Sequence, residues 1–79
     1  MNELETKILN AYKDKAEDYN MFIEDDICHY MKICMYGMEE MAKVLGYVLY
    51  AHHKNDCVGL PFDYISIAKD GKVLAQVNI

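Results

Sequence analysis

The stretch DICHYMKICMYGMEEMAKVLGYVLYAHHK, residues 26–54, carries the strongest hydrophobic pattern in the chain and decides the expected fold. Apolar residues recur in it at alternating spacings of four and three, the seven-residue repeat of a helix that packs along another helix. The resulting seam consists of Ile27, Met31, Cys34, Met38, Met41, Leu45 and Val48, and His52 continues it. No proline interrupts the run, so the pattern predicts one long helix, with Gly37 as its weakest point and the expected place of a kink.

A second, shorter helix is predicted over residues 3–20. Leu4, Ile8, Tyr12, Ala16 and Tyr19 recur at three-to-four-residue spacing and fall on one side of that helix. At 1.5 Å per residue, it is about 27 Å long and the helix over 26–54 is about 42 Å long. The shorter helix cannot cover the whole seam of the longer one. Either the long helix bends or a second copy of the chain covers the rest, and we expect a homodimer.

The C-terminal residues change from helical to alternating spacing. Residues 64–68 and 73–77 are rich in β-branched side chains, and Asp70-Gly71 between them is a strong signal for a two-residue hairpin turn. Such a turn places Ile67 opposite Leu74 and Ile65 opposite Gln76. The chain is therefore predicted to be a single α+β domain over residues 1–79, with two N-terminal helices followed by a β-hairpin.

Charge is distributed unevenly along the chain. Residues 1–40 hold ten acids and four lysines, a net charge of −6, whereas residues 41–79 hold three acids and four lysines, a net charge of +1. The chain contains no arginine, no basic stripe and no glycine-rich phosphate loop, so direct nucleic-acid binding is disfavoured. The longest apolar run is too short for a membrane span and no signal peptide is visible, so we expect a cytoplasmic protein.

Six carboxylates around the end of the first helix form the candidate partner-binding surface. They are Asp14, Glu17, Asp18, Glu24, Asp25 and Asp26. The simplest interpretation is that the last three cap and initiate the next helix, and that the charge keeps the protein dissolved. The alternative is a row of negative charges, one helical turn or ~5–6 Å apart, that imitates the phosphates of a DNA strand.

The cysteines and histidines do not form a recognisable metal or catalytic motif. Cys28 and Cys34 are six residues apart and would point about 120° away from each other on a helix. A nucleophilic pair of His53 and Cys57 would lack a group to orient the imidazole. We therefore expect no metal, no cofactor and no catalytic residue, with Cys34 in the core and with His52 and His53 closing a helix.

In overall character the chain resembles the early host-takeover proteins of Gram-positive bacteriophages: it is small and acidic, and rich in lysine, tyrosine and methionine without arginine or tryptophan. Some members of that group are DNA mimics that block the histone-like nucleoid protein. The resemblance implies a non-enzymatic, homodimeric inhibitor that binds a basic, DNA-binding host protein. The rival hypothesis is an assembly or scaffolding module that binds its partner through the Met/Tyr-rich helix face.

Overall fold

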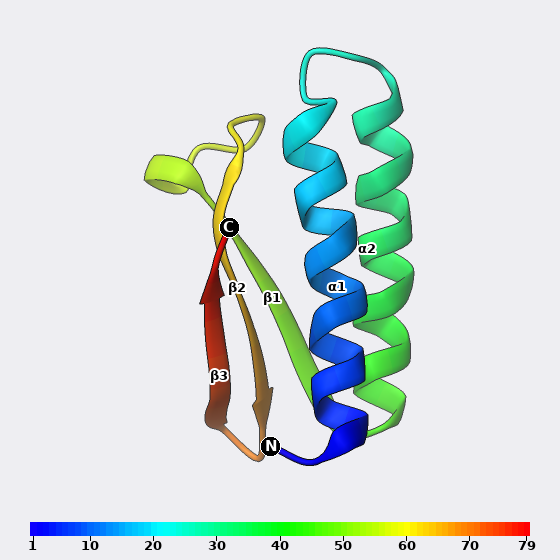
Figure 1. Cartoon of the computed structure of the whole chain (residues 1–79), viewed down its shortest axis with the longest axis vertical. Coiled ribbons are helices and arrows are strands. Elements are labelled where there is room, and N and C mark those ends of the chain that lie inside the picture. The colour runs from blue at the N-terminus through cyan, green and yellow to red at the C-terminus, as the bar shows by residue number, and fades with distance from the viewer.

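Two helices lie side by side on one face of a three-stranded antiparallel sheet (Figure 1). The computed structural model describes residues 1–79. Its elements in chain order are α1 (Glu3–Met21), α2 (Ile27–Val44), β1 (Tyr47–His53), a short 3-10 turn (Lys54–Asp56), β2 (Phe62–Lys69) and β3 (Lys72–Asn78). The predicted α+β class is confirmed. None of the helices combines the length and the apolar character that crossing a membrane requires.

The predicted long helix over residues 26–54 is wrong. Helix α2 runs without interruption through Gly37 and ends at Val44 instead, and the chain then turns at Gly46, whose φ is +90°. A left-handed glycine just after the last helical turn is a common way to end a helix, because only glycine adopts that conformation without steric cost. The β-branched and aromatic residues that follow, Tyr47 to Tyr50, then form a strand.

Ending α2 at Val44 also removes the argument that led to the expected dimer. The two helices contain 19 and 18 residues, so they are nearly equal in length and α1 covers α2 from end to end. The predicted N-terminal helix is confirmed, but its buried side differs at two positions, because Glu5 and Leu9 are buried in place of Leu4 and Ile8. Leu9 is buried, at 3% exposed, whereas Leu4 is 51% exposed.

The sheet contains one more strand than expected, because β1 pairs with β2. The predicted hairpin at Asp70-Gly71 is confirmed, and both turn residues have positive φ. The predicted register is wrong beyond the first pairs, since Ile67 lies opposite Ala75 and not opposite Leu74. The register shift between Ile67 and Ala68 leaves Leu74 as the extra residue of β3, as in a β-bulge.

The core lies between the helical layer and the sheet. Its buried apolar side chains come from both helices, β1 and β2: Leu9, Tyr12, Ala16, Tyr19, Cys28, Met35, Ala42, Tyr47, Leu49, Phe62, Ile65 and Ile67. The hydroxyl groups of two buried tyrosines donate hydrogen bonds to carboxylates. The Tyr12 hydroxyl donates to Glu39, and the Tyr47 hydroxyl donates to Glu5 over 2.9 Å. Every buried side-chain polar atom therefore has a hydrogen-bond partner.

Candidate interaction surfaces

The six acidic residues predicted to bind a partner lie at one end of the molecule. Three belong to the second half of α1 and three to the loop that joins α1 to α2, at the top of Figure 1. The loop over residues 54–61 is at the same end, whereas the N-terminus and the Asp70-Gly71 turn lie at the other. Asp18 is half-buried and the other five acids are exposed. We call these six residues the acidic end.

None of the six carboxylates of the acidic end forms an ion pair. The ion pairs of the structure join Lys7 to Glu3, Lys43 to Glu40, and His52 to two aspartates elsewhere. Only Asp25 contributes to capping α2, since its Oδ1 accepts a hydrogen bond from the Ile27 amide over 3.2 Å, whereas Asp26 forms no such bond. Helix initiation therefore accounts for one of the six side chains.

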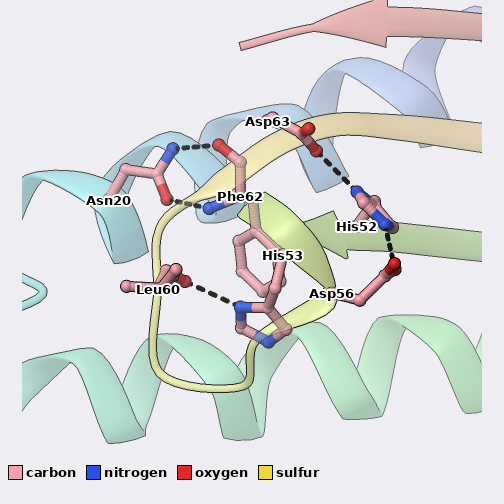
Figure 2. A network of polar contacts seen from close by, with 7 residues as sticks. All are labelled: Asn20, His52, His53, Asp56, Leu60, Phe62 and Asp63. Atoms are coloured by element: carbon pink, nitrogen blue, oxygen red, sulfur yellow. Dashed lines mark hydrogen bonds and ion pairs between the residues drawn. The ribbon is translucent and has the colours of Figure 1, made fainter.

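The acidic end is held in place by Asn20, near the C-terminal end of α1. Its side-chain amide donates to the Phe62 carbonyl over 2.9 Å and accepts from the Phe62 amide over 2.7 Å, as Figure 2 shows. These two bonds join the end of α1 to the start of β2. Tyr19 packs against the Phe62 ring, at 4.7 Å between ring centroids, beside the same junction.

The predicted seam of α2 is only partly buried, which corrects its interpretation as a continuous core stripe. Its members Met31 and Met38 are half-buried, whereas the other members of the seam, Ile27, Cys34, Met41, Leu45 and Val48, are exposed. The fully buried positions of α2 are Cys28, Met35 and Ala42, which lie one residue later in the same seven-residue repeat. The predicted seam is not the buried side of α2 because this helix packs against both α1 and the sheet. The buried side is therefore rotated toward the sheet, relative to the predicted seam.

A shallow groove runs between α1 and α2 beside the exposed part of the seam. Its volume is about 290 Å³, and it is lined by Lys7, Ile8, Ala11, Met38, Met41, Ala42 and Leu45. Six of these seven side chains are apolar. The groove was not predicted from the sequence. The predicted helix continued beyond Val44, so the end of α2 beside which the groove lies was not expected.

His52 is the centre of a polar network on β1, not the end of a helix as expected. Its Nδ1 lies 2.9 Å from Asp63 and its Nε2 contacts Asp56 (Figure 2), and its ring stacks on Tyr64. Both ring nitrogens can donate only when the imidazole is protonated. The hydrogen bonds to Asp63 and Asp56 accordingly raise the pKa of His52, and the bond from His52 lowers the pKa of Asp63.

His53 lies on the side of β1 that faces the helices, and both of its ring nitrogens also form polar contacts. Its Nδ1 lies 2.7 Å from the Leu60 carbonyl, and its Nε2 lies 3.1 Å from the Lys32 ammonium group (Figure 2 shows the first contact). The hypothetical pair of His53 and Cys57 is therefore not brought together by a hydrogen bond. The structure contains no cluster of three or more histidine, cysteine or acidic side chains with the geometry of a metal site. The two histidines instead hold the 54–61 loop against the body of the protein.

The exposed apolar side of α2 is the feature that the sequence interpretation missed. Tyr30, Ile33 and Val44, which were not assigned a role, are between 66% and 77% exposed. A signal for them was present, because Ile27, Tyr30, Cys34, Gly37, Met41 and Val44 are themselves spaced three and four apart. Two overlapping seams share the helix, and periodicity alone does not say which one faces the core.

Comparisons with protein-family models, curated proteins and solved structures found no match to this chain.

Proposed function

We propose that the chain is a non-enzymatic interaction protein that binds a basic, DNA-binding host protein through its acidic end and blocks it by nucleic-acid mimicry. The observation that carries the proposal is the set of six carboxylates at one end of the fold, none of which is neutralised by an ion pair. Carboxylates left without an internal partner are available to the lysine and arginine side chains of another protein.

The position of two of the eight lysines supports the same proposal. Lys69 and Lys72 flank the turn at the far end of the molecule, and the longest dimension of the fold is 35 Å. That distance is several Debye lengths at physiological salt, so these lysines do not screen the acidic end. Lys13 and Lys15 flank Asp14 on α1, and Lys54 lies in the 54–61 loop, so a basic partner meets a surface with an excess of negative charge and not a purely negative one. Such an excess still accelerates association and orients the partner.

A second candidate function is an assembly module that binds through the Met/Tyr-rich face of α2. It is favoured by the exposure of Tyr30, Ile33, Tyr36 and Met41, each of which is 62–66% exposed. Exposed apolar and aromatic side chains of this size on one face are typical of interaction surfaces. The two functions use different surfaces, so one protein can be tested for both.

Charge reversal at the acidic end tests the proposal against a matched control. We would measure binding of a purified histone-like nucleoid protein to the wild-type chain and to Glu17→Lys/Glu24→Lys, with Glu3→Lys/Glu40→Lys as the control. Both double variants change the net charge by the same amount, at exposed positions on opposite ends. We expect binding to fall at least tenfold in the first variant and to be nearly unchanged in the second.

Salt and competition distinguish the two candidate functions. Binding by the acidic end should weaken steeply as ionic strength rises, and duplex DNA should compete for the same partner. Binding through the apolar face of α2 should be nearly independent of salt. Equal loss of binding in both double variants, or salt-independent binding, would contradict mimicry by the acidic end.

A further inference from the structure

The solvent-facing side of α2 carries a complete heptad repeat with no partner in the chain. Its six positions, which we call the outer seam, are Ile27, Tyr30, Cys34, Gly37, Met41 and Val44. All six are exposed, and no charged residue interrupts them. A run of this spacing on one helix is the pattern by which helices pack along each other, and the fold itself leaves it uncovered.

We infer that a second copy of this chain covers the outer seam, with the two α2 helices packed antiparallel about a two-fold axis near the middle of the helix. The proposal names an interface and an orientation for the homodimer expected from the sequence, and it does not depend on the proposed function. It replaces the predicted seam of Ile27, Met31, Cys34, Met38, Met41, Leu45 and Val48, part of which the structure uses inside the monomer.

Side-chain sizes along the outer seam match in the antiparallel orientation. With the two-fold axis between residues 35 and 36, Cys34 lies opposite Gly37 of the second copy, so the smallest residues meet where the helices cross. Tyr30 then lies opposite Met41, a favourable aromatic–sulfur pairing. At the ends, Ile27 lies opposite Val44. Small residues at the centre let the backbones approach, and larger residues fill the wider spaces on either side.

A parallel arrangement would be opposed by charge. It would bring the two acidic ends together, with Glu24, Asp25 and Asp26 of both copies at the same end of the helix pair. The antiparallel arrangement separates them by the length of α2, about 27 Å for 18 residues. It also places the acidic N-terminal end of one α2 near Lys43 of the other, in the last turn of that helix.

The exposed apolar area is the size that a dimer interface needs. The large side chains of the outer seam, with the neighbouring Ile33 and Leu45, are 38–77% exposed. At about 150–250 Å² for a large side chain, they leave on the order of 700 Å² of apolar surface per copy. A standard stable interface buries ~800 Å² per partner. Glu40 and Lys43 lie beside the outer seam and form an ion pair with each other. Neither charge would therefore be left without a partner at the edge of the dimer interface.

Gly37→Gln is the first test, because it acts on the dimer without harming the monomer. A side chain added at Gly37 meets nothing within 4 Å in the chain, and glutamine favours the helix more than glycine does. It would, however, separate the two helices at their crossing point. We expect the wild-type chain to have twice the monomer mass by light scattering, and Gly37→Gln to be monomeric with unchanged or higher thermal stability of the fold by circular dichroism.

A pair of tyrosines on α2 supplies the matched control. Tyr30 and Tyr36 are 66% and 63% exposed, but only Tyr30 belongs to the outer seam. Tyr30→Lys should therefore dissociate the dimer, and Tyr36→Lys should leave its mass unchanged. Dissociation by both variants, or by neither, would overturn the assignment of the outer seam as the interface.

The orientation is tested by charge complementation. Tyr30→Glu and Met41→Lys should each be monomeric. In the antiparallel dimer the double variant Tyr30→Glu/Met41→Lys sets opposite charges against each other, so the dimer should return. In a parallel dimer it sets like charges together and none should form. A wild-type chain that is monomeric at every concentration overturns the inference, while binding to the nucleoid protein through the acidic end is tested separately and can still succeed.

Discussion

Replacing Asn20 with alanine should destabilise the protein more than its position near the end of a helix suggests. The Asn20 side chain forms two hydrogen bonds with the backbone of Phe62, of 2.9 and 2.7 Å, across a separation of 42 residues. Each such bond contributes about 1 kcal/mol, and the cost is higher, up to ~3 kcal/mol, where the backbone group left without a partner is fully buried. We expect Asn20→Ala to lower the free energy of unfolding by ~2–3 kcal/mol.

Urea unfolding followed by circular dichroism measures this change. The midpoint should move to lower urea with an unchanged slope, since the surface exposed on unfolding stays the same. For a domain of this size, 1 kcal/mol corresponds to about 4–8 °C, so the melting temperature should fall by roughly 8–24 °C. Hydrogen exchange at the Phe62 amide should accelerate as well, because that amide donates to Asn20.

Asn10→Ala is the matched control for Asn20→Ala. Asn10 lies on the exposed side of α1 and its side chain forms no hydrogen bond. Both substitutions gain the same few tenths of a kcal/mol of helix propensity, so that contribution cancels in the comparison. If Asn20→Ala lowers the free energy of unfolding by no more than Asn10→Ala does, the two bonds do not hold α1 to β2 and the reasoning fails.

Three further predictions follow from single contacts. Gly46→Ala should cost more than 1 kcal/mol because its φ is +90°, whereas Gly37→Ala should stabilise the helix by about 0.5–1 kcal/mol; chemical denaturation of the two variants compares them directly. Tyr47→Phe should lower the unfolding free energy by about 1–3 kcal/mol, since it removes the donor to a buried glutamate of α1, again measured by urea titration. The contact between His52 and Asp63 should stabilise most between about pH 4 and 6.5. The raised pKa of His52 gives stability that is complete below about 6.5 and is lost as pH rises through the folded value, and the lowered pKa of Asp63 gives stability that is lost as pH falls through its folded value. An NMR titration of the His52 ring should therefore show a midpoint above 6.5 that moves down in Asp63→Asn.

The sequence predicted the elements with local signals and failed where one glycine had two possible roles. The first helix and the Asp70-Gly71 hairpin were found because side-chain spacing and turn chemistry are properties of adjacent residues. The predicted helix over residues 26–54 continued through Gly46, but this glycine ends the helix and allows β1 to begin. A continuous apolar run across Gly46 fits either outcome, and pairing with β2, far along the chain, decides between them.

The candidate surfaces, like the fold, could be predicted from the sequence only in part. The position of the six acidic residues could be predicted because they lie near the end of the first predicted helix and the start of the second. Which side of α2 faces the core was not predictable, since Ile27, Cys34 and Met41 belong to both overlapping seams. The roles of Glu5 and Asn20 were also out of reach, because their partners Tyr47 and Phe62 are each 42 residues away.

Those two 42-residue connections, one at each end of α1, have a consequence for how the protein is made. While the chain is leaving the ribosome, α1 and α2 are complete before any strand exists, and the sides of the two helices that face the sheet have nothing to pack against. The glutamate at one end of α1 must wait for β1, and the asparagine at the other must wait for β2. The sheet-facing sides of the nascent helices therefore stay exposed until β2 has emerged, and a chaperone or a sister chain that shields them during synthesis would raise the yield of folded protein.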